Sequence, residues 1–105
     1  MKFAIFLAAV FLLTISVQAN ITLPKVFTSN MVLQRDKPVK IWGWAAKGEK
    51  ITVQFNAQKI VTRAGATGDW MITLQAMPAG GPYELKIDGK NSMVLSGIQI
   101  GRAHV

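Results

Sequence analysis

Residues 51–63 read ITVQFNAQKIVTR, and this stretch decides the fold class that we predict for the chain. Apolar side chains stand at every odd position of residues 51–55, which is the two-residue period of a strand with one buried face. A second run rich in β-branched residues, 59–63, follows across a short connection at 56–58, a spacing typical of a hairpin. The stretch therefore predicts two neighbouring antiparallel strands.

The same alternation continues outward from this hairpin. Strands are predicted at residues 39–44, 70–74 and 83–88 and from residue 93 onward, with Gly, Pro and Asn in the turns between them. No helical periodicity occurs after the first 19 residues. We therefore expect an all-β domain, an antiparallel two-sheet β-sandwich of the Ig/fibronectin-like or jelly-roll-like kind. The side chains expected on its inner faces are Val39, Ile41, Trp70, Ile72, Leu74, Tyr83, Leu85 and Ile87.

The first residues have the pattern of a secretory signal peptide. Met1 and Lys2 give a basic start, residues 3–17 are apolar apart from Thr14 and Ser16, and small residues precede a cleavage point after Ala19. This apolar run is shorter than the ~20 residues that a bilayer-crossing helix needs, so we expect no stable membrane anchor. The sequence predicts export to the periplasm or the extracellular space, with residues 1–19 removed.

Charge and cysteine content narrow the partners further. The chain has 12 Lys and Arg against 5 Asp and Glu, a formal net charge of +7. Its lysines are dispersed singly without a basic run, which is typical of a solvated surface, so no nucleic-acid partner is expected. There is no Cys, so the fold must be stabilised by burial without disulfides or thiolate metal sites. We expect no cofactor.

Residues 27–45, FTSNMVLQRDKPVKIWGWA, resemble the N-terminal region of bacterial sialate O-acetylesterase-like proteins. Residues 48–49, 68–70 and 80–83, and the stretch from Gly97 to Gly101, fit the same family. The resemblance covers nearly all of the chain after the leader. It implies that residues 20–99 form a β-sandwich that precedes an SGNH-type hydrolase domain.

The resemblance also implies a reaction for the whole protein. In this family a Ser attacks the acetyl carbonyl of an acetylated sialic acid or related sugar, a His acts as base and an Asp orients it. The family's catalytic block reads like G-[DE]-V-W-x-x-S-G-Q-S-N-M, whereas here Gly101 is followed by residues 102–105, RAHV. We therefore expect a truncation before the hydrolase domain, and no catalytic or metal-binding residue in this chain. The acetylated sugar would be the substrate of the whole protein, and the hydrolase domain its intramolecular partner.

Residues 100–105, IGRAHV, are expected to be a non-native tail at the truncation point. One reading frame of a common sequencing-library adapter encodes these six residues and then a stop codon. The chain's only histidine, His104, lies in this tail. Resequencing of the locus tests this origin.

Ser29-Asn30-Met31 mimics the Ser-Asn-Met of the catalytic block, but we reject Ser29 as a nucleophile. A working serine needs a general base within hydrogen-bond reach and donors for the oxyanion, and His104 belongs to the suspect tail. The favoured interpretation is a loop whose Met31, Val32 and Leu33 pack into the sandwich. This loop belongs to the structural motif of the family, not to its catalytic block.

Three tryptophans allow two interpretations. Trp42, Trp44 and Trp70 could form an aromatic platform for sugar rings, but as strand residues of a small sandwich they are interpreted as core anchors. Trp42 and Trp44 share a strand face with Lys40, so part of that face is expected to meet water or to dock on the hydrolase domain. A stand-alone secreted module that binds carbohydrate or serves in adhesion stays open as the alternative function.

The acidic residues give no site. The three aspartates stand beside turn residues, where Asp side chains commonly accept hydrogen bonds from local backbone N–H groups. The two glutamates are separated by predicted strands, so no acid–base or metal pair is predicted. The residues concerned are Asp36, Asp69, Asp88, Glu49 and Glu84.

Overall fold

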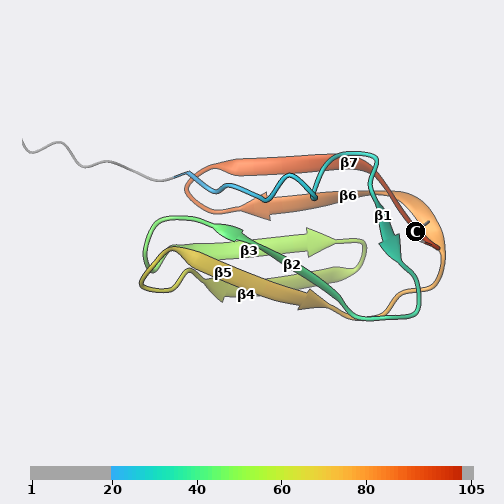
Figure 1. Ribbon diagram of the computed structural model, residues 1–105, viewed down its shortest axis with the longest axis horizontal. Coiled ribbons are helices and arrows are strands. Elements are labelled where there is room, and N and C mark those ends of the chain that lie inside the picture. The colour runs from blue at the N-terminus through green and yellow to red at the C-terminus, as the bar shows by residue number, and fades with distance from the viewer. Residues whose placement is uncertain (1–19, 103–105) are drawn as a thin grey trace, which may run out of the picture.

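The computed structural model describes residues 20–102, and they form seven strands in two sheets (Figure 1). No helix occurs in this range, and therefore none long and apolar enough to cross a membrane. The all-β prediction is confirmed, while the predicted signal peptide and His104 lie outside the described residues. The strands are β1 (Val32–Gln34), β2 (Val39–Trp44), β3 (Lys50–Phe55), β4 (Gln58–Arg63), β5 (Asp69–Leu74), β6 (Gly80–Asp88) and β7 (Ser92–Gly101).

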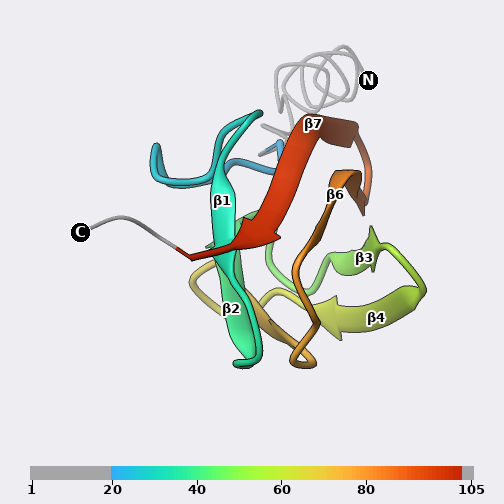
Figure 2. The same ribbon diagram turned by 90° about the vertical axis from the view of Figure 1, so that its right-hand side faces the viewer.

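The two sheets differ in size and lie against each other. The larger has the order β1-β7-β6-β3-β4, and the smaller contains only β2 and β5. Figure 1 shows β2 and β5 lying over β3 and β4, and Figure 2, turned by 90°, separates the layers. This arrangement confirms the two-sheet prediction.

The expectation of a wholly antiparallel sandwich is wrong at β1. This strand pairs in parallel with the end of β7, with Leu33 opposite Ile100, whereas the other pairs are antiparallel. A parallel pair needs a long connection, and here almost the entire domain lies between the two strands. The pairing places the first and the last strand of the described chain side by side.

The β3–β4 hairpin forms as predicted, with a tighter turn. Phe55 pairs with Gln58, so only Asn56 and Ala57 remain in the connection and Gln58 belongs to β4. Asn56 has a φ of 54°, a left-handed conformation that the short polar side chain of Asn tolerates. The chain can therefore reverse within two residues.

The core lies between the two sheets and follows the predicted alternation. Side chains of β3 alternate between buried and half-buried or exposed, and the buried ones meet those of β2 and β5. Since there are no disulfides, removal of this apolar surface from water is the main stabilising contribution. The fully buried large side chains are Phe55, Ile41, Ile51, Leu74, Leu85, Ile87, Ile98 and Val53.

Residues 31–33 correct one prediction. They were expected to form a loop with all three side chains packed inward, but residues 32–34 form β1. Leu33 is buried and Met31 half-buried, while Val32 is 46% exposed. Neighbouring side chains of a strand point to opposite faces, so Val32 and Leu33 cannot both point inward.

The end of β7 includes two residues of the expected non-native tail. Ile100 is buried and pairs with both Leu33 and Gly80, and Gly101 accepts a hydrogen bond from the backbone N–H of Arg35 at 2.9 Å. Residues 103–105 lie outside the described range. The adapter origin of the tail stays a prediction.

Candidate functional site

The Ser29-Asn30-Met31 loop is held against β7. The Ser29 Oγ accepts a hydrogen bond from the backbone N–H of Ser96 at 3.0 Å, and the N–H of Asn30 donates to the Ser96 carbonyl at 2.8 Å. Gly97, at a φ of 69°, lies directly beneath Asn30, whose Oδ1 would overlap a Cβ at this position. Ser29 thus anchors the loop, and residues 20–102 contain no histidine to act as its base.

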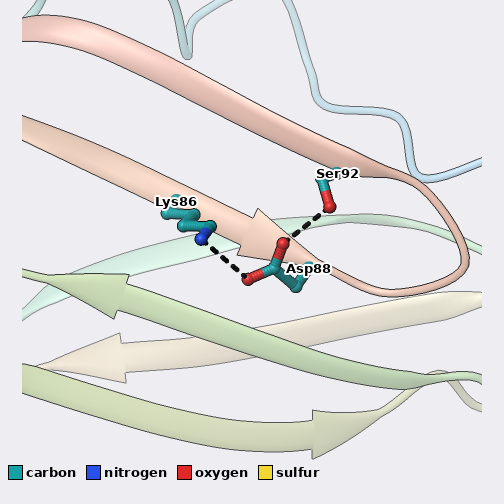
Figure 3. Close-up of polar contacts among 3 residues, drawn as sticks. All are labelled: Lys86, Asp88 and Ser92. Atoms are coloured by element: carbon teal, nitrogen blue, oxygen red, sulfur yellow. Dashed lines mark hydrogen bonds and ion pairs between the residues drawn. The ribbon is translucent and has the colours of Figure 1, made fainter.

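The aspartates find side-chain partners instead of the predicted backbone N–H groups. Asp69 accepts a hydrogen bond from the Thr67 hydroxyl at 2.8 Å. Asp88 accepts one from the Ser92 hydroxyl at 2.7 Å and lies 3.9 Å from the Lys86 ammonium (Figure 3). Asp69 and Asp88 are strand residues whose backbones pair with neighbouring strands. Their side chains accept hydrogen bonds from nearby hydroxyl groups. The third, Asp36, lies 3.6 Å from the Arg35 Nε on the surface.

Glu49 is the carboxylate that does bind backbone groups. It is buried, its Oε1 accepts from the Ala46 N–H at 3.1 Å, and its Oε2 accepts from the Lys90 N–H at 2.7 Å. A hollow of about 510 Å³ lies beside it, but both carboxylate oxygens are already engaged. Glu49 therefore joins the connection between β2 and β3 to the turn between β6 and β7, while Glu84 is exposed on β6. The sequence indicated a turn at Glu49 but not its burial.

No group of three or more His, Cys, Asp or Glu side chains within residues 20–102 is placed to hold a metal ion.

The outward side of the β2–β5 sheet carries the most distinctive surface of the described chain. We call it the aromatic face. Cross-strand partners place Trp42 opposite Met71 and Trp44 opposite Asp69. Trp42 and Trp44 are 40% and 44% exposed, so their interpretation as core anchors is wrong. Alternation along β2 sends Ile41 inward, and the indoles on either side of Gly43 must therefore point outward. The face consists of Lys40, Trp42, Trp44, Asp69, Met71 and Thr73.

Trp70 is the tryptophan that does serve as a core anchor. It is 3% exposed and lies on the inward side of β5. It packs beneath Gly43, where an added Cβ would lie 2.9 Å from the Trp70 Cζ2 and would overlap the Thr22 carbonyl. The Trp70 Nε1–H has no hydrogen-bond partner. The fit around Gly43 shows how closely the two strands and the segment before them approach.

An N-terminal segment supports one edge of the aromatic face. Thr22 and Trp44 exchange two backbone hydrogen bonds of 2.9 Å, and the Phe27 ring meets Trp42 edge-on with centroids 4.6 Å apart. A shallow hollow of about 330 Å³ opens over the face, lined by Trp42, Gly43, Trp44, Asp69, Trp70 and Met71. Asp69 supplies its only polar side chain besides the indoles.

Among solved structures, the chain is similar to a carbohydrate acetylesterase from Xanthomonas citri, with 36% sequence identity and a TM-score of 0.76. The similarity covers 77% of this chain and 19% of that enzyme, so the chain spans about a fifth of the enzyme's length. No protein-family model and no curated protein sequence matches the chain. The likeness relates this β-domain to a carbohydrate esterase.

Proposed function

We propose that this chain is the N-terminal β-sandwich part of an exported sialate O-acetylesterase-like enzyme, which hydrolyses O-acetyl esters on sialic acid or related sugars. The observation that carries the proposal is the similarity, in sequence and in fold, to a carbohydrate acetylesterase several times longer. The motif of residues 27–45 supports the finer assignment, since it resembles the region before the hydrolase domain in that family.

The proposed role of the sandwich is that of a scaffold. Acyl transfer to a serine needs an activated hydroxyl, a base and donors for the oxyanion. Ser29 holds the loop to β7, and Glu49 holds two turns together, so both are engaged in the fold itself. We therefore assign bond cleavage to a hydrolase domain that follows the sandwich, and we expect no esterase activity from these 105 residues alone.

The genomic locus gives the test. The proposal predicts that the reading frame continues beyond Gln99 into Val-Trp and then Gly-Gln-Ser-Asn-Met, followed by the rest of a hydrolase domain. The purified exported protein is expected to begin at Asn20, which N-terminal sequencing checks. A genomic stop codon directly after Val105, with no hydrolase encoded behind it, would remove the esterase assignment.

The aromatic face favours one alternative function, a secreted carbohydrate-binding module. Two exposed indoles two residues apart on one strand offer flat apolar surfaces of the kind on which sugar rings stack. Titration of the mature chain with sialylated and acetylated glycans, followed by tryptophan fluorescence, separates the two functions. Saturable binding supports the module, and an unchanged spectrum supports the scaffold.

A further inference from the structure

We propose that the aromatic face is the surface on which the hydrolase domain of the whole protein packs. This inference rests on the proposed function and adds to it the interface between the two domains. It also assigns a purpose to Trp42, Trp44 and Met71, which a free-standing domain would leave in water.

Three exposed apolar side chains lie together on the aromatic face. Seven large hydrophobic residues are exposed in the described range. Trp42, Trp44 and Met71 lie on the aromatic face, and Val26 precedes the Phe27 that packs against Trp42. The larger sheet carries only single residues of this kind on β1, β4 and β7. A contiguous apolar patch of this type marks an interaction surface, whereas single exposed residues are ordinary.

The composition of the patch fits a protein partner. Tryptophan and methionine are enriched at the centres of protein interfaces, and polar residues form the rim. Here Trp42, Trp44 and Met71 form the centre, with Lys40 and Thr73 at one end of the sheet. A sugar site needs several convergent hydrogen-bonding groups, whereas Asp69 is the one carboxylate that lines this hollow.

The end of β7 lies close to this face. Gln99, the last residue before the expected non-native tail, is paired with Val32, and β2 begins at Val39, seven residues later. Seven extended residues span at most about 25 Å, so a chain that leaves β7 starts within that distance of the beginning of β2. Figure 2 shows β7 ending on the side of the molecule where β1 and β2 lie. A following domain therefore needs only a short connection to cover the aromatic face.

Two matched residues allow a direct test. Met71 on β5 is 54% exposed and Val61 on β4 is 52% exposed. Without an interface, the ratio of the oxidation rate in the native protein to that in the unfolded protein should therefore be similar for the two residues. The protein used is the product of the complete genomic reading frame. Hydroxyl-radical oxidation of each residue is followed by mass spectrometry in the native protein and in urea. The Val61 rate serves as the internal control.

We expect Met71 in the native whole protein to be oxidised at least about tenfold more slowly than in urea, since the centre of an interface is fully buried. Val61 should differ by no more than about twofold, because an exposed strand residue keeps its contact with water. An unprotected Met71 in a protein that releases acetate overturns the interface and leaves the proposed function intact. Protection that depends on protein concentration, or on added acetylated sugar, identifies a second copy or a glycan as the occupant and also overturns it. If the complete reading frame encodes no hydrolase domain, the proposed function itself is wrong, and this result is known before the oxidation experiment is done.

A pair of variants gives an independent readout. Met71→Glu places a charge in the proposed interface, and Val61→Glu places one at a site of equal exposure outside it. We expect Met71→Glu to lower the temperature at which the whole protein loses acetate release by about 2 °C or more, because a carboxylate buried in the interface without a partner is unfavourable. Val61→Glu should leave that temperature unchanged. Equal shifts for the two variants contradict the interface.

Discussion

The two sides of the β2–β5 sheet use the same residue type in opposite ways. Trp70 lies inward beneath Gly43 and is buried, while Trp42 and Trp44, on the neighbouring strand, lie outward and are exposed. The strand period alone assigns these places, because a tryptophan one position along a strand moves to the other face. Trp70 therefore contributes to folding, whereas Trp42 and Trp44 keep part of their surface accessible.

Replacement of the inward tryptophan should have the largest effect. Trp70→Ala leaves a large cavity between the sheets and is expected to lower the free energy of unfolding by about 3–5 kcal/mol, much of the stability of a small domain. Trp42→Ala removes mainly the edge contact with Phe27 and should cost about 1 kcal/mol. Urea unfolding followed by circular dichroism measures both. Equal losses would remove the distinction between the two sides.

Gly43 tests the inward side without removing a side chain. Gly43→Ala places a Cβ against the Thr22 carbonyl and the Trp70 ring. We expect a loss of about 1–3 kcal/mol from overpacking. Gly48→Ala is an informative contrast, since a Cβ there meets no atom within 4 Å but the residue has a φ of 72°. If only Gly48→Ala destabilises the chain in thermal unfolding, backbone conformation and not packing sets the cost.

Glu49 extends the comparison to the larger sheet. Glu49→Gln keeps the shape but turns an N–H₂ group toward one of the two backbone donors, so a loss of about 1–3 kcal/mol is expected. Glu84→Gln, on the exposed surface of β6, should change stability by less than about 0.5 kcal/mol. Chemical denaturation of both variants checks this, and matching results would contradict a structural role for the buried carboxylate.

The smallest effect is expected on the outward side. In the 105-residue chain, Met71→Ser and Val61→Ser should each change the free energy of unfolding by no more than about 0.5 kcal/mol, because both side chains are half exposed. The same denaturation experiment measures them. A large loss for Met71→Ser would show that the aromatic face already stabilises the isolated domain.

Much of the fold was predictable because alternation is local. It placed β2 to β6 within a few residues of their bounds and identified most of their inward side chains. It could not reveal β1, since three residues are too short to show a period. The parallel partner of β1 is the end of β7, more than sixty residues away, and no local pattern specifies such a pairing.

The candidate surface was only partly predictable. The two-residue period placed Trp42 and Trp44 on one face with Lys40, but their residue type favoured a core assignment. The structure shows that both side chains are exposed on that face. Glu49 was missed because one of its partners, Lys90, is 41 residues distant in the sequence. Long-range contacts of this kind depend on how the strands assemble.

The proposed function is tested most directly by acetate release from acetylated sialic acid, measured for two purified proteins: the 105-residue chain and the product of the complete genomic reading frame. We predict release by the complete protein, abolished when the Ser of its Gly-Gln-Ser-Asn-Met block is replaced by Ala, and none by the short chain. Serine-dependent release by the short chain would contradict the scaffold role. A complete protein that hydrolyses no acetylated sugar would contradict the proposed enzyme.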